Sequence, residues 1–157
     1  MIMNKNRGLT LIEIIVVIAI FGLIIVFGLT LDLSSFKRST FHSEQRILVS
    51  VLEKARSRSL NNMFGSVHGF CYIAPNYVIF RDRVTCLPTS TTDEIVPANI
   101  NIASNLGTTF PIEIVFAQLT GKLVPQLTPA NNELVIHITD GIKSADIKIN
   151  NEGTINW

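Results

Sequence analysis

The sequence contains few of the residue patterns that enzymes and metal proteins need. Its three histidines, His42, His68 and His137, are widely separated, and no H-x-x-x-H or C-x-x-C pattern occurs, so zinc and haem sites have no support. A P-loop, a dinucleotide-binding fingerprint and a G-x-S-x-G elbow are also missing, as is the D-x-D-x-D-G string of a calcium loop. The sequence offers no set of residues that could act together as nucleophile, general base and orienting group. We therefore predict that the chain is not an enzyme and holds no cofactor or metal.

Charged residues are scarce too, at 16% of the 157 residues, with a net charge of +1. Residues 64–157 carry five basic and eight acidic side chains, so this part has no general electrostatic footprint for nucleic acid. Residues 32–63 carry six basic and three acidic side chains, and among them Lys54, Arg56 and Arg58 raise the question of a phosphate site. We interpret these three as the solvated side of an amphipathic helix, and we expect no nucleic-acid partner.

Charge is absent altogether from Ile14 to Leu31, a mostly apolar run of 18 residues. A helix over this run is about as long as the roughly 30 Å hydrocarbon core of a membrane. Lys5 and Arg7 precede it and favour a cytoplasmic N-terminus, which places the rest of the chain outside the cytoplasm. We therefore predict a single-pass protein of the cytoplasmic membrane. A secretory signal fits less well, because residues 32–36 offer no small-x-small cleavage site.

Glu13 stands at the start of this apolar segment, where a carboxylate is costly. A charge at the centre of a membrane helix costs about 2.5–3.5 kcal/mol, and less near the interface. Buried charges persist when they are paired, so Glu13 is expected to have a partner. A plain signal anchor accounts for the length and the flanking charge of the segment, but not for this carboxylate.

The string KNRGLTLIE at residues 5–13 resembles the leader and mature start of type IV pilins and pseudopilins, in which a short basic leader ends in Gly. The resemblance implies that prepilin peptidase cuts between Gly8 and Leu9 and that Leu9 is then N-methylated. It also implies that Glu13 pairs with the new terminal ammonium of a neighbouring subunit during filament assembly. The expected partners are other pilin subunits, the peptidase and an inner-membrane assembly platform.

The residues after the apolar run indicate a helical stem followed by a β-rich head. Residues 33–63 contain no Pro or Gly, and an apolar face recurs at helical spacing, so we expect one helix over residues 9–63. That face consists of Phe41, Leu48, Val51, Leu52 and Ala55. The predicted divisions are a cleaved leader at 1–8, a transmembrane and assembly helix at 9–31, an amphipathic stem at 32–63 and a head at 64–157.

The head shows alternating and β-branched patterns that predict antiparallel strands. Strands are expected at 67–73, 77–81, 112–116, 134–138, 145–149 and 154–157, with turns at 75–76, 140–141 and 151–153. Residues 87–107 have little pattern and are interpreted as an exposed excursion. The predicted fold class is α+β, with a long N-terminal helix packed on a mainly antiparallel β head, as in the pilin fold.

Two further strings narrow the resemblance. ARSRSL at 55–60, followed by VHGFC at 67–71, is similar to the helix end and first strand of minor pseudopilins, a group with the H-type subunits of type II secretion and the T-type minor pilins. FAQLTG at 116–121 resembles the strand-to-turn signature of the same group. The resemblance implies a minor subunit of a filament.

Cys71 and Cys86 lie 15 residues apart in the head. The predicted topology puts them outside the cytoplasm, where disulfides persist, and a bridge would contribute about 3 kcal/mol in the chain-entropy model. Two separate thiols, with Cys71 buried in a strand, remain the alternative.

Three functions follow from these observations. The first is a structural minor pilin or pseudopilin that assembles through its N-terminal helix into a pilus or a type II secretion pseudopilus. The second is a DNA-binding minor pilin of a competence pilus, although the tail at 151–157 lacks the arginines of the DNA-binding members. The third is an unprocessed single-pass anchor for an external β domain.

Overall fold

The computed structural model describes residues 10–29, 33–87, 90–125 and 132–157. Contacts divide the chain into two compact units, residues 1–38 and residues 39–157. The first unit contains α1 (Leu11–Leu29), and α2 (Leu33–Leu60) leads into the second. Residues 30–32, within the helix expected over 9–63, lie outside the described ranges. No helix in those ranges is both long and apolar enough to cross a membrane.

The helical stem ends slightly earlier than expected, at Leu60 instead of residue 63. Asn62 takes a left-handed conformation with φ 50°, which an asparagine tolerates better than most residues and which ends a helix. A short 3-10 turn, η1 (Met63–Gly65), then leads into the first strand.

A five-stranded antiparallel sheet forms one side of the head, in the order β3-β2-β1-β4-β5. The hairpin of the first two strands turns at Ala74 and Pro75, one residue earlier than the predicted 75–76, and its register pairs Ile73 with Asn76. The strands are β1 (His68–Ile73), β2 (Asn76–Arg81), β3 (Glu94–Pro97), β4 (Ile114–Phe116) and β5 (Leu123–Val124).

A second antiparallel sheet has the order β6-β7-β8. The long hairpin of this sheet turns at residues 140–143, as the Asp140-Gly141 pair predicts, and Ile136 opposes Ile147 in its register. The strands are β6 (Glu133–Thr139), β7 (Ser144–Asn150) and β8 (Ile155–Asn156). Both sheets agree with the predicted α+β fold and its antiparallel head.

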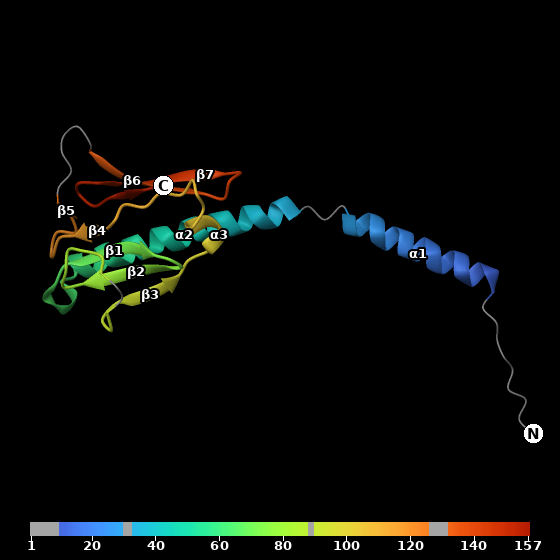
Figure 1. Cartoon of the computed structure of the whole chain (residues 1–157), viewed down its shortest axis with the longest axis horizontal. Helices are drawn as coiled ribbons and strands as arrows, with labels where there is room; N and C mark the ends of the chain where they lie inside the picture. The colour runs from blue at the N-terminus through green and yellow to red at the C-terminus, as the bar shows by residue number, and fades with distance from the viewer. Residues whose placement is uncertain (1–9, 30–32, 88–89, 126–131) are drawn as a thin grey trace, which may run out of the picture. The chain divides into compact units, whose positions relative to one another are not determined.

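The core of the head forms where α2 runs between the two sheets (Figure 1). The predicted apolar face of the stem is confirmed, because all five of its residues are buried. Leu48, Leu52 and Ala55 are fully covered and share one cluster with Phe70 of the first sheet and Ile136 of the second. Burying one such Leu stabilises the fold by roughly 1.5–3 kcal/mol, so α2 is a structural part of the head.

The excursion expected at residues 87–107 is partly wrong. It contains β3, which pairs with β2, and the short helix α3 (Ile100–Ala103). Ile102 and Ala103 are buried in the main core. A four-residue edge strand and a single helical turn carry too little periodicity to be read from sequence, since their pairing partners define them.

Candidate assembly site

The first turn of α1 is formed by the TLIE string. The helix begins at Leu11, so Thr10 is its N-cap and Glu13 its third residue. The Glu13 amide donates to the Thr10 carbonyl at 3.0 Å and to Thr10 Oγ1 at 3.4 Å. This is the spacing of a capping box, and a carboxylate in the first turn also complements the positive end of the helix dipole. The Thr-x-x-Glu pattern could have been recognised from sequence.

The surface of α1 after this cap is apolar on every side. All the side chains described in it, from Leu11 to Val26, are exposed, among them Ile18 at 65% and Phe21 at 62%. A helix that is apolar all round belongs in an apolar environment or among other helices. The carboxylate of Glu13 forms no ion pair with any described residue.

The other residues predicted for this site lie outside the part of the chain that the structure describes. They are Lys5, Arg7, Gly8 and Leu9. The cleavage position and the terminal amine proposed to pair with Glu13 therefore remain predictions.

The two cysteines of the head are joined. Cys71 of β1 and Cys86 form a disulfide with a Cα–Cα distance of 6.2 Å. Cys71 lies on the face of the first sheet opposite to α2, in a small second cluster with Phe80 and Val115. The bridge ties the segment after β2 to this outer face.

A buried carboxylate on α2 attaches the stem to the head. Glu44, only 4% exposed, accepts a hydrogen bond from the Tyr77 hydroxyl at 2.7 Å and one from the Asn99 amide at 2.9 Å. Burial, and then the hydrogen bond to Glu44, raise the pKa of the Tyr77 phenol, so it stays protonated and donates. Asn99 is the N-cap of α3. Neither partner of Glu44 can be read from the sequence, because both lie more than 30 residues away along the chain.

The basic residues of α2 contact the head, so their interpretation as a solvated side is only partly right: Lys54 is exposed, whereas Arg56 and Arg58 are half-buried. Lys54 and Arg58 both form salt bridges with Glu94 of β3. Hydrogen bonds from Lys54 and Arg58 hold the pKa of the Glu94 carboxyl below its usual value. Arg56 donates to the Glu152 carbonyl at 3.0 Å. These contacts leave the three side chains poorly placed for phosphate.

Two glycines allow the end of α2 to approach the turns of the head. The FAQLTG turn joins β4 to β5, and the Leu119 amide within it donates to the Ser59 carbonyl at 2.9 Å. Gly121 and Gly153 have φ of 62° and 74°, and a Cβ on Gly153 would lie 2.0 Å from the Gly121 carbonyl oxygen. The strand-to-turn interpretation of this signature agrees with the structure.

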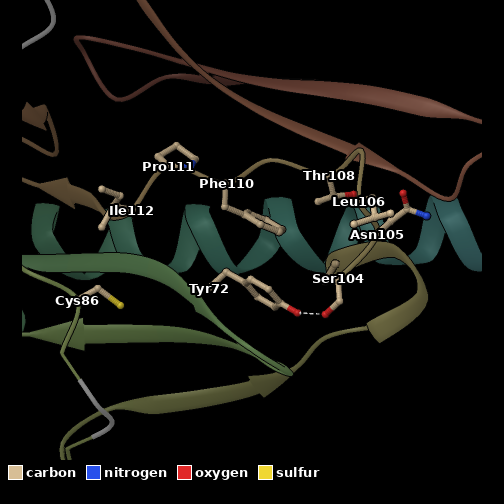
Figure 2. Close-up of a pocket in the computed structure, with 10 residues that line it drawn as sticks. Tyr72, Cys86, Ser104, Asn105, Leu106, Thr108, Phe110, Pro111 and Ile112 are labelled. Carbon is tan, nitrogen blue, oxygen red and sulfur yellow. Dashed lines mark hydrogen bonds between the residues drawn. The ribbon is translucent and has the colours of Figure 1, made fainter.

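An open groove of about 580 Å³ lies beside α3. Tyr72 stacks on Phe110 at 4.7 Å between ring centroids, and the Tyr72 hydroxyl lies 2.6 Å from Ser104 Oγ (Figure 2). The lining has no charged side chain. Within the described ranges, no three His, Cys, Asp or Glu side chains gather as a metal site.

Comparison with known proteins identifies the N-terminal segment. Residues 3–29 match the family described as "Prokaryotic N-terminal methylation motif". No curated protein and no solved structure matches the chain. The match spans the cap at Thr10 and Glu13 and the apolar helix after it. The matched motif supports a membrane-anchored, type IV pilin-like subunit.

Proposed function

We propose that this chain is a minor pilin or pseudopilin that joins a short filament through α1 after its leader, residues 1–8, has been removed. The observation that carries the proposal is α1 itself, a helix inside the methylation motif that is apolar apart from Glu13 in its first turn, next to the N-cap Thr10. The proposed topology has the N-terminus in the cytoplasm and the head outside, with other subunits, prepilin peptidase and an assembly platform as partners.

The apolar surface of α1 supports assembly in a bundle of helices. In a membrane or among like helices, its Ile, Leu, Val and Phe side chains avoid water, whereas alone in water they do not. The carboxylate of Glu13 is then the one charge described on this helix, and a charge in such surroundings needs a counter-charge. The ammonium formed at Leu9 in a neighbouring subunit would supply it.

The head supports a structural role. Its polar groups at the stem, Glu44, Lys54 and Arg58, bond to the head's own residues and hold it on α2. The groove beside α3 lacks charged groups. These contacts support a head that serves as the structural part attached to α2.

Cleavage is tested by expressing the full chain with a prepilin peptidase and measuring its intact mass. We expect the loss of residues 1–8, and Gly8→Leu should prevent this loss. Gly22→Leu is the matched control, because a Cβ on Gly22 meets nothing within 4 Å, and it should be cut normally. An unchanged mass for the wild-type chain would rule out the proposal.

The role of Glu13 is tested with two substitutions that separate cap from charge. Glu13→Gln preserves the capping pattern, since Gln also occupies the third position of a capping box, but removes the charge. If the charge pair drives assembly, both Glu13→Gln and Glu13→Ala leave cleavage intact and reduce the amount of chain in sheared filaments. Glu53→Gln, at an exposed position of α2, is the control. Normal incorporation of the Gln variant would refute the charge pair.

A further inference from the structure

The connection between α2 and β1 encloses a histidine. We call residues 59–68 the corner; it comprises the end of α2, the 3-10 turn and the first residue of β1. His68 is only 1% exposed, whereas His42 on α2 is exposed and His137 on β6 is partly exposed. Histidine is the side chain whose charge ordinarily changes between pH 5 and 8, so a buried one can make a structure sensitive to pH.

The ring of His68 is held mainly by packing, with the Ser66 backbone beside it. Among the described residues, neither ring nitrogen has a hydrogen-bond partner. The backbone is firmly placed, because the His68 amide donates to Ser59 Oγ at 2.8 Å and Ser59 Oγ donates to the Phe116 carbonyl at 2.9 Å. The ring centroid lies 6.4 Å from that of Phe64. Such a site accepts a neutral imidazole and offers little to a charged one.

The charges around the ring also oppose protonation. Burial lowers the pKa of His68 most, and Arg58 of α2 and Arg81 of β2 lower it further. The Ser66 backbone and the Asp82 carboxylate act in the opposite direction, but the sum stays below the usual 6.5. A protonated ring would be a third cation beside two arginines.

The backbone of the corner is strained. Asn62, Phe64 and Gly65 have φ of 50°, 59° and 66°. This left-handed region suits Gly and tolerates Asn, but it is unfavourable for a bulky Phe. Phe64 is nevertheless 68% exposed, and the Arg81 guanidinium carbon lies 3.8 Å from its ring centroid. The strain lowers the free energy needed to open the corner.

We propose that the corner is a proton-sensitive hinge, closed around a neutral His68 ring and opened when acid protonates that ring. Opening exposes the ring to water and moves it away from Arg58 and Arg81. The pKa of His68 is lower in the closed corner than in the open one. The closed corner therefore has its full stability above pH 6.5 and loses stability as the pH falls below 6.5. This hinge is a property in addition to the proposed function. It would respond to external pH if the head lies outside the cytoplasm.

Amide hydrogen exchange on the full chain in detergent micelles tests the hinge. After correction for the intrinsic effect of pH on exchange, opening of the corner should increase by up to about tenfold per pH unit below 6.5. Amides of β6 and β7 serve as the internal reference. His68→Leu should abolish this dependence, and His42→Gln should leave it unchanged. The same dependence in His68→Leu, or none in the wild type, overturns the proposal.

A titration of the wild-type chain keeps the proposal testable even if His68→Leu does not fold. With ¹³C-labelled histidine, the His68 ring should report a neutral form at pH 7 and a titration midpoint below 6.5. A midpoint at or above 6.5 would overturn the hinge.

Discussion

Replacing Glu44 by Ala measures how strongly the stem is attached to the head. The carboxylate accepts hydrogen bonds from the Tyr77 hydroxyl and the Asn99 amide. Hydrogen bonds to a charged group contribute about 1.5–3 kcal/mol each, and a buried hydroxyl left without an acceptor adds a cost of its own. We therefore expect Glu44→Ala to lower the free energy of unfolding by roughly 3–5 kcal/mol. Glu44→Gln, which keeps an acceptor, should lower it by about 1–2 kcal/mol.

Urea unfolding of the full chain in micelles, followed by the near-UV circular dichroism of the tyrosines, gives these free energies. Glu53→Ala, at an exposed position of α2, is the control and should change stability by no more than about 0.5 kcal/mol. Tyr77→Phe alone should cost roughly 1.5–3 kcal/mol. In the Glu44→Ala background it should cost nothing or restore stability, because the hydroxyl no longer has an acceptor there. Additive losses, or a Glu44→Ala effect as small as the control, would refute the reasoning.

Three other substitutions test separate parts of the head by the same assay. Gly153→Ala should cost roughly 2–4 kcal/mol, because a methyl group at positive φ would overlap the Gly121 carbonyl, and an unchanged urea midpoint would contradict that contact. Cys71→Ser should cost about 3 kcal/mol by opening the 15-residue loop to Cys86, and a loss below 1 kcal/mol would mean that the bridge constrains the unfolded chain little. Glu94→Gln should destabilise the chain at pH 7, but the difference should vanish as the pH falls below 4.5, because basic side chains of α2 hold the pKa of Glu94 below that value. A difference that does not shrink as the pH falls below 4.5 would argue against these ion pairs.

The sequence predicts the parts of this fold that depend on local pattern. The buried face of α2 follows from helical periodicity, since positions such as Leu48 and Leu52 recur on one side. The hairpin turns follow from Pro75 and from Asp140 with Gly141, whose backbone preferences act within a few residues. Fold class therefore follows from such patterns alone.

Contacts between residues that are far apart in the sequence cannot be predicted from local sequence patterns. Glu44 finds Tyr77 and Asn99, which are 33 and 55 residues away. Arg58 appeared solvated because its partner Glu94 lies on β3, a strand with too few residues to show alternation. In the assembly site, the sequence predicts that the charge of Glu13 is costly, and the position of Glu13 three residues after the N-cap Thr10 is a local pattern as well.

The contact between Arg56 and Glu152 joins residues 96 positions apart and has a consequence for biosynthesis. The helix leaves the ribosome long before the sheets that cover it, and Leu48 and Leu52 stay without their cover until the C-terminal strands have been made. Chain synthesis takes about 5–20 residues per second, so this interval lasts on the order of 5–20 s. During that time the nascent chain presents an apolar stripe, which is fully covered only when the last turn of the chain closes on Arg56.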